Sequence, residues 1–155
     1  MKRFNKIEQY QALYTQVKQE GKSIGFVPTM GALHDGHLSL VERSKKETDI
    51  TVCSIFVNKK QFNVTKDFDN YPRIVSQDST LLAELECNVL FAPDEDEIYP
   101  PQNSNSIIKE QEENIISIGN FENIMEDVFR PGHFAGVVTI VKKLFDIIKP
   151  DKAYF

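Results

Sequence analysis

The segment from Ile50 to Val57 is a continuous run rich in β-branched residues, and it restricts the fold more than any other part of the chain. Such a run predicts a strand that is buried on both faces, which is typical of parallel sheets. A shorter apolar run of strand type lies at residues 24–27, and residues 36–47 follow it with a helical pattern. Together they predict a strand–helix–strand unit, so we expect an α/β fold.

The alternation of helix and strand patterns continues on both sides of this unit. Apolar residues at helical spacing predict the helices, and short apolar runs predict the strands. The further expected elements are a helix at 7–17 that stops near Gly21, a helix at 74–86, a strand at 88–92 and a core helix from His133 to Pro150.

Polar stretches separate these elements. Residues 58–71 predict a loop near the carboxyl end of the buried strand, where parallel sheets commonly form ligand sites. Residues 93–101 predict a proline-bounded acidic loop. Residues 102–120 are polar, with weak strand patterns at 106–108 and 115–118.

The length of the chain limits its organisation. With 155 residues, of which 41% are hydrophobic, the chain can bury one ordinary core, so we expect a single domain over residues 1–155. Its last residues, 153–155, have the pattern of a strand that has just begun. We therefore expect the chain to be a fragment of a longer protein.

Composition excludes several classes of function. The net charge of −5 argues against general binding of nucleic acid, which favours a basic surface. The sequence has no apolar run of membrane-spanning length and no signal-peptide pattern. Two cysteines, Cys53 and Cys87, suit reduced thiols better than a disulfide framework. These observations predict a soluble cytoplasmic protein that binds neither nucleic acid nor membrane.

Acidic residues are concentrated in one segment. Residues 94–127 carry ten acids against one lysine, a charge of −9, so the remainder of the chain carries +4. The acidic run is expected to be a solvated surface. The mildly basic remainder suits an anion site.

The sequence Pro28-Thr29-Met30-Gly31-Ala32-Leu33-His34-Asp35-Gly36-His37 lies where a predicted strand ends and a predicted helix begins. A turn of this kind directs backbone N–H groups and the positive end of a helix dipole at one place, which suits a phosphate. His34 and His37 are one helical turn apart and can donate to the same anion. The arrangement predicts nucleotide chemistry.

Other interpretations of these residues remain open. The two histidines could be half of a metal site, but zinc needs a third or fourth ligand, and neither cysteine lies in a spaced Cys/His motif. They could also be helix-capping groups without a function. Asn58, Lys60 and Gln61 could form an ordinary polar loop after a strand. Arg130 is a stronger functional candidate than His133, which could simply begin the last helix.

Several motifs, in the same order along the chain, resemble those of the pantothenate synthetase (pantoate–β-alanine ligase) family. The string Pro-Thr-Met-Gly-x-Leu-His-x-Gly-His is much more specific than His-x-Gly-His alone. The matching segments are 25–37, 54–58 with Gln61-Phe62, Asp69 with Tyr71-Pro72-Arg73, Phe91-Ala92-Pro93, Ile98-Tyr99-Pro100, 130–134 and Lys143-Leu144-Phe145.

The resemblance implies a Rossmann-like, doubly wound parallel sheet of the His-x-Gly-His nucleotidylyltransferase type, incomplete at the C-terminus. It also implies an ATP-dependent condensation of D-pantoate with β-alanine through a pantoyl adenylate, with Mg²⁺ bound mainly by the nucleotide and no metal ligands from this chain. A homodimer is implied as well. The implied ATP-binding residues are Met30, Gly31, Ala32, Leu33, His34, Asp35, Gly36 and His37.

The resemblance also assigns particular roles. His34 and His37 stabilise charge on the phosphates, and His37 is the proton donor. Gln61 binds pantoate and orients β-alanine, with Asn58 close by. Met30 lines the nucleotide and pantoate sites, and Arg130 supports the substrate site.

This sequence departs from the family pattern at three points. Lys59 replaces the usual proline after Asn58, and Asp127 replaces the glycine that usually follows the glutamate at position 126. The chain is also about half the family's length and lacks the later Gly-Glu-Lys-Asp and Ser-Ser-Arg-Asn type motifs and the C-terminal domain. We therefore expect weak or absent catalysis. The alternatives are another His-x-Gly-His nucleotidylyltransferase and a non-catalytic binding or dimerisation module.

Overall fold

The computed structural model describes residues 1–62, 68–101 and 133–155. Within these residues, five parallel strands form one sheet in the order β1-β4-β3-β2-β5. The strands are β1 (Lys2–Phe4), β2 (Ile24–Thr29), β3 (Ile50–Ile55), β4 (Val89–Phe91) and β5 (Lys152–Ala153). The helices are α1 (Ile7–Gln19), α2 (Asp35–Glu47), α4 (Val75–Glu84), α5 (Glu95–Ile98) and α7 (His133–Ile148), with a short 3₁₀ helix, η1 (Lys59–Gln61).

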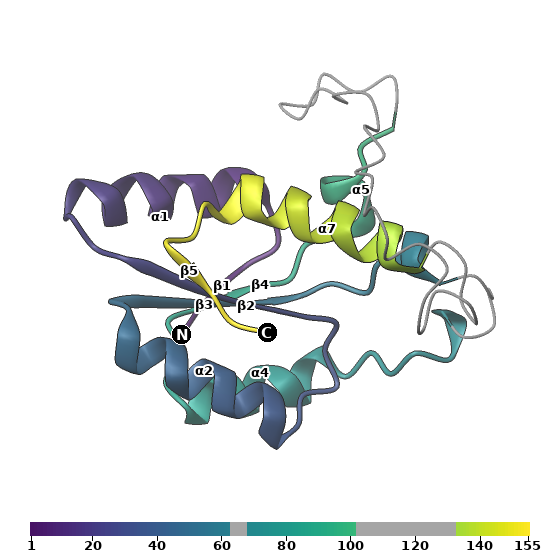
Figure 1. Ribbon diagram of the computed structural model, residues 1–155, viewed down its shortest axis with the longest axis horizontal. Helices are drawn as coiled ribbons and strands as arrows, with labels where there is room; N and C mark the ends of the chain where they lie inside the picture. Colours follow the sequence, from purple (N-terminus) through teal and green to yellow (C-terminus); the bar gives the residue numbers. More distant parts are fainter. Residues whose placement is uncertain (63–67, 102–132) are drawn as a thin grey trace.

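Helices cover both faces of the sheet. Helices α1 and α7 lie on one face, and α2 and α4 lie on the other (Figure 1). Successive residues of one strand face different layers: Phe26 and Val52 belong to the core under α1 and α7, whereas Val27 and Cys53 belong to the opposite core. All four are 0% exposed, which confirms that the central strands are buried on both faces. The doubly wound parallel sheet predicted above is therefore confirmed.

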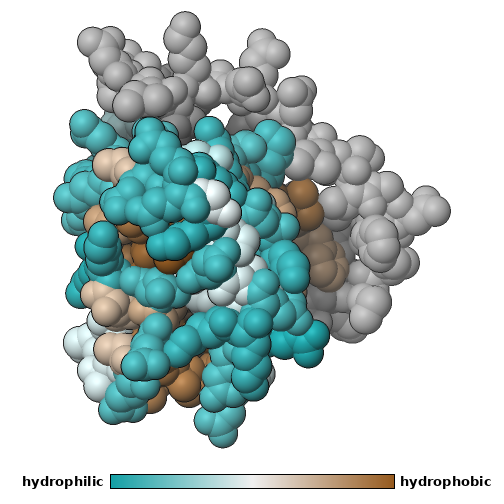
Figure 2. Space-filling model, turned by 90° about the vertical axis from the view of Figure 1, so that its left-hand side faces the viewer, coloured by the Kyte–Doolittle hydropathy of each residue, from teal (hydrophilic) through white to brown (hydrophobic). Residues whose placement is uncertain are grey.

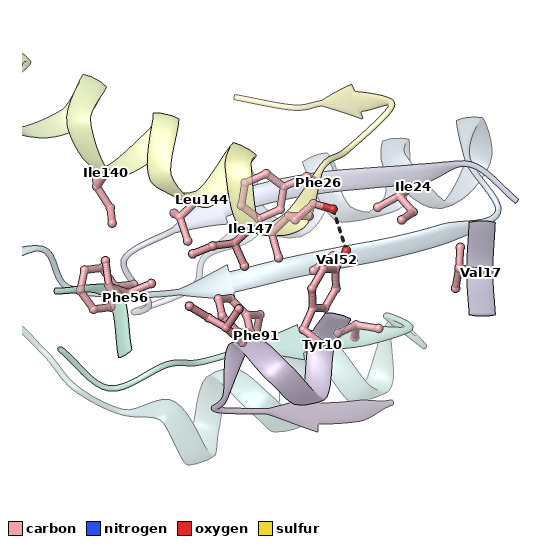
Figure 3. Close-up of a cluster of buried hydrophobic side chains, with 14 residues drawn as sticks. Tyr10, Val17, Ile24, Phe26, Val52, Phe56, Phe91, Ile140, Leu144 and Ile147 are labelled. Carbon is pink, nitrogen blue, oxygen red and sulfur yellow. Dashed lines mark hydrogen bonds between the residues drawn. The ribbon is translucent and has the colours of Figure 1, made fainter. Parts of the chain in front are cut away.

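The larger core joins the two ends of the chain. It contains Tyr10 from α1, Phe91 from β4 and Leu144 from α7 (Figure 3). The hydroxyl of Tyr10 donates to the carbonyl of Ile148 at the end of α7, at 2.9 Å. This hydrogen bond satisfies a carbonyl at the helix end that has no partner within the helix itself.

The last strand begins close to where it was expected. Strand β5 pairs with β2 in parallel, with Lys152 beside Gly25 and Ala153 beside Phe26. Asp151 fixes this pairing, because its carboxylate accepts from the backbone N–H of Ile24 at 2.7 Å and from Lys18 Nζ at 2.6 Å. The expected strand at residues 153–155 is thus confirmed, one residue earlier.

Some predicted boundaries and loops were wrong. Strand β1 was not predicted, because it has only three residues and two of them are exposed. Residues 93–101, expected to be a loop, contain α5, and residues 58–71 contain η1. The weak strand patterns at 106–108 and 115–118 lie outside the described residues.

The edge of the sheet where β2 and β3 begin is covered mainly by hydrophilic side chains (Figure 2).

No helix in the described ranges is long and apolar enough to cross a membrane. Both cysteines are free and buried, and burial raises the pKa of each thiol. Neither thiol is therefore suited to act as a thiolate at neutral pH.

Candidate nucleotide and substrate site

The candidate residues gather at the carboxyl edge of the sheet, on the right in Figure 1. The histidine turn follows β2, and Asn58 and Gln61 follow β3. Since β2 and β3 are adjacent and parallel, the two segments leave the sheet at the same edge. The sequence had predicted only that each segment follows a strand of a parallel sheet.

A tight turn carries the chain from β2 to α2. Gly31 has φ of 85° and Ala32 has φ of 51°, so two successive residues are in the left-handed region. The hydroxyl of Thr29 accepts from the N–H of Gly31 at 3.1 Å and donates to the carbonyl of Ser54 at 2.7 Å. The start of the turn is therefore anchored to β3.

The middle of the turn is bonded to Asp78 of α4, a residue that no sequence motif singled out. The N–H of Ala32 donates to its Oδ2 at 2.9 Å, and the N–H of Leu33 donates to its Oδ1 at 2.8 Å. In this structure these two N–H groups are therefore bonded to a carboxylate and are not free to bind a phosphate. A direct role of Ala32 and Leu33 in binding ATP stays a prediction.

His34 is the N-cap of α2, so the prediction that it caps a helix is confirmed. Its Nδ1 accepts from the N–H of Gly36 at 3.1 Å. Because Nδ1 is the acceptor, the hydrogen of the neutral ring lies on Nε2. The imidazole can therefore cap the helix and still donate from its exposed side.

The ring of His37 lies beside that of His34, with centroids 4.0 Å apart. Its Nδ1 is buried and has no hydrogen-bond partner among the described residues, which leaves Nε2 as the nitrogen that can bond a ligand. Burial lowers the pKa of His37, the neighbouring His34 lowers it further, and Asp78 partly opposes both. The neutral ring is therefore favoured at pH 7.

A metal site is not apparent at this turn. In the part of the chain that the structure describes, no three His, Cys, Asp or Glu residues are grouped so that they could hold a metal ion. The two histidines are instead arranged to present Nε2 donors at the start of a helix.

Gln61 and Met30 are brought together from neighbouring strands. The Nε2 of Gln61 lies 2.6 Å from the Sδ of Met30, and Gln61 is only 7% exposed. A polar amide thus lies beside a soft apolar side chain, next to the histidine turn. This pair can hold a small molecule that has both polar and apolar groups.

Asn58 is completely buried and its amide bonds three segments together. Its Oδ1 accepts from the N–H of Lys60 at 3.3 Å and from the hydroxyl of Tyr99 at 3.0 Å, and its Nδ2 donates to the carbonyl of Gly136 at 3.0 Å. These bonds hold η1 against α7. A direct contact of Asn58 with substrate stays a prediction.

Helix α7 completes the support of Gln61. The Nδ1 of His133 lies 2.9 Å from the carbonyl oxygen of Gln61. A Cβ on Gly136 would lie 2.7 Å from the Cα of Gln61, so only glycine permits this close approach. Arg130 lies outside the described residues, and its role stays a prediction.

A cavity of about 310 Å³ opens at the same edge. Met30 and Gly31 line it from the turn after β2, Phe56 from just after β3, and Asp78 from α4. Two cations that were given no role above, Arg3 of β1 and Arg73, also line it. Arg73 lies over the ring of Phe68, 4.6 Å from its centroid, which holds the guanidinium at the cavity.

These features define a class of protein: an α/β domain of the nucleotidylyltransferase type, in which a central strand ends in a His-x-Gly-His turn. Comparison with known families agrees. The sequence model described as Pantoate-beta-alanine ligase matches residues 2–155. The chain therefore belongs to the pantoate–β-alanine ligase family.

Individual relatives and solved structures support this assignment. The pantothenate synthetase of Staphylococcus epidermidis is 46% identical over 149 residues, which are 96% of this chain and 49% of the relative. That of Thermosipho africanus is 46% identical over 155 residues, which are 100% of this chain and 52% of the relative. This chain spans about half the length of the curated relatives that it matches.

Two crystal structures have the same fold as this chain. Pantothenate synthetase from Thermus thermophilus has a TM-score of 0.83 and 38% identity, over 100% of this chain and 51% of that one. Pantoate-beta-alanine ligase from Francisella tularensis, complexed with beta-gamma ATP and beta-alanine, has a TM-score of 0.83 and 43% identity, over 99% of this chain and 56% of that one.

Proposed function

We propose that this chain forms the nucleotide- and pantoate-binding part of a ligase that condenses D-pantoate with β-alanine at the expense of ATP. The observation that carries the proposal is the pair of histidines at the start of α2, which lies at the same sheet edge as the Met30–Gln61 pair. A related protein of this family was crystallised with beta-gamma ATP and beta-alanine, which supports both substrates.

In the first step, a carboxylate oxygen of pantoate attacks the α-phosphorus of ATP, and pyrophosphate leaves. Negative charge builds on the phosphate oxygens during this attack. The Nε2–H groups of His34 and His37 would donate to these oxygens. As charge develops, it favours the protonated form of His37, which takes up a proton from solvent and then donates a stronger hydrogen bond to the phosphate.

In the second step, the amine of β-alanine attacks the carbonyl of the pantoyl adenylate, and AMP leaves. Gln61 would bind pantoate and orient the amine, while Met30 covers the apolar part of pantoate. Holding two small reactants in line supplies most of the catalysis that this step needs.

The proposal also includes the metal ion, the oligomeric state and the cellular location of the enzyme. Mg²⁺ would accompany ATP, bound mainly through the phosphates and water. We propose a homodimeric cytoplasmic enzyme, of which residues 1–155 form the N-terminal domain.

Calorimetric titration of the 155-residue chain with ATP and with pantoate tests this proposal. We expect heat from both ligands, and a loss of ATP affinity of about tenfold in His37→Ala, as for one lost hydrogen bond to a charged group. Glu42→Gln, on the exposed face of the same helix, is the control and should bind ATP normally.

The results that contradict the proposal are equally specific. No heat from either ligand would favour a non-catalytic module. ATP–pyrophosphate exchange that requires a phosphate ester in place of pantoate would indicate another nucleotidylyltransferase. A rapid pantoate-dependent exchange, abolished in His37→Ala, would support the assigned reaction but contradict the expected slow turnover.

A further inference from the structure

Asp78 is a buried carboxylate for which the proposed reaction gives no role. It lies in the first turn of α4 and is 1% exposed. Its two oxygens accept from the N–H groups of Ala32 and Leu33, at 2.9 and 2.8 Å. These partners are 46 and 45 residues away along the chain, and they belong to the turn that ends at His34.

We propose that Asp78 is a positioning residue, whose carboxylate holds the turn after β2 in the shape that presents His34 and His37 to a phosphate. The proposal rests on the function proposed above for the two histidines. Its structural part, the effect of Asp78 on the turn, is independent of that function.

The backbone of the turn needs such a restraint. Ala32 has φ of 51°, a conformation that a residue with a side chain adopts at a cost. A carboxylate that accepts two successive N–H groups favours this arrangement, because bonds to a charged acceptor are stronger than neutral ones. Leu33 directly precedes the N-cap His34, so a shift of the turn also shifts the start of α2.

The space around Asp78 is closely filled on the side of the turn. A Cβ on Gly31 would lie 2.9 Å from Oδ2 of Asp78 and 3.1 Å from Ile55. The carboxylate thus lies in close contact with the Gly31 end of the turn.

Its charge also has to be compatible with a nearby nucleotide. Asp78 lines the same cavity as Met30, and an uncompensated carboxylate there would repel a phosphate. The two N–H bonds disperse its charge. Arg3 and Arg73 line the same cavity, as do the acidic residues Asp94 and Glu95. The geometry therefore indicates that Asp78 supports the turn and does not itself contact the nucleotide.

Amide hydrogen exchange of the 155-residue chain without ligand tests the structural part. In Asp78→Asn, one carboxylate oxygen becomes an amide nitrogen, which cannot accept from a backbone N–H. We expect the amide hydrogens of Ala32 and Leu33 to exchange about tenfold faster or more. Core amides such as those of Phe26 and Val52 should be unchanged, and Glu84→Gln, exposed on the same helix, should leave all these rates unchanged.

Titration with ATP tests the functional part. Asp78→Asn should bind ATP about tenfold or more weakly, together with the faster exchange at Ala32 and Leu33. Weaker binding with unchanged exchange would overturn the positioning role, since Asp78 would then act on the ligand directly. Faster exchange in a chain whose wild type binds no ATP would support the restraint but contradict the proposed function.

A measurement on the wild type covers the case in which Asp78→Asn does not fold. The amide proton shifts of Ala32 and Leu33 should follow the titration of the Asp78 carboxyl carbon, because each N–H bonds to that group. If neither amide shift follows the carboxyl titration, the proposed restraint is absent.

Discussion

Two imidazoles whose ring centroids lie 4.0 Å apart cannot both be protonated without repulsion. In this site His34 is fixed by its bond to Gly36, and His37 is partly buried behind it. In the absence of an anion, the neutral form of His37 is therefore favoured. A phosphate bound beside the two rings would favour the protonated form, so protonation is coupled to ligand binding.

The pKa of His37 should accordingly lie below the ordinary value of 6.5 in the free protein. The unfolded chain then binds this proton more readily than the folded one. The contribution of His37 to the free energy of unfolding is thus fully present above about pH 6.5. It is lost progressively as the pH falls from 6.5 through the lower pKa of the folded protein. Titration of the ring protons by NMR measures this pKa.

Replacing His34 with glutamine should raise the pKa of His37 towards 6.5, because the neighbouring imidazole that opposes protonation of His37 is removed. His133→Gln, at the start of α7, is the matched control and should leave that pKa unchanged. A His37 that titrates at or above 6.5 in the wild type would contradict the proposed neutral donor.

At the scale of elements, the contact between α7 and η1 determines where Gln61 lies. The two elements approach until the backbone of η1 touches Gly136, and Asn58 bonds across the same contact at 3.0 Å. Helix α7 therefore supports the candidate substrate site, although none of its described side chains was assigned to substrate.

Gly136→Ala should push η1 away from α7, since the new Cβ would lie 2.7 Å from the Cα of Gln61 and from the carbonyl oxygen of Lys60. Overpacking of this kind costs about 1–3 kcal/mol, more than the gain of up to about 1 kcal/mol in helix propensity. Pantoate affinity should fall, and the NMR signals of the Gln61 side-chain amide should shift. Asp146→Ala, exposed on the same helix, should change neither; equal effects of both variants would exclude a specific contact.

The elements also show what the sequence could and could not predict. Long periodic segments such as α1 and α7 were predicted correctly, because each carries a full apolar face. Strand β1 and helix α5 have three and four residues, too few for any period to be visible.

Tertiary contacts of single residues were harder to predict. Asp78 was missed because its partners are distant in sequence, although it lies four residues before the buried Leu82. An acid on the apolar face of a helix is the signal that could have identified it. The close approach at Gly136 gives no such signal, because glycine within a helix has no local pattern.

For the whole molecule, the hydrogen bond from Tyr10 to Ile148 joins the first helix to the last one. Tyr10 is 1% exposed, and burial raises the pKa of its hydroxyl, so the group remains a donor at all ordinary pH values. The bond spans 138 residues and closes the layer of helices over the larger core.

Tyr10→Phe should lower the free energy of unfolding by about 1–2 kcal/mol, because it leaves a buried carbonyl without its donor. Unfolding in urea, followed by circular dichroism, measures this change. Tyr14→Phe, on the same helix and only partly buried, should change the stability by less than about 0.5 kcal/mol. A similar loss in both variants would mean that the buried hydrogen bond contributes little.

The pairing of β2 with β3 runs without interruption from Ile24 beside Ile50 to Thr29 beside Ile55. Met30 directly follows β2, and η1 with Gln61 follows β3, so the register of the sheet sets where the two segments leave it. A slip of two residues between β2 and β3 would displace Met30 relative to the segment of Gln61 by about 7 Å and separate the two side chains. Substitutions within the paired segment can therefore lower the stability of the protein without altering the spacing of Met30 and Gln61, as long as the register is preserved.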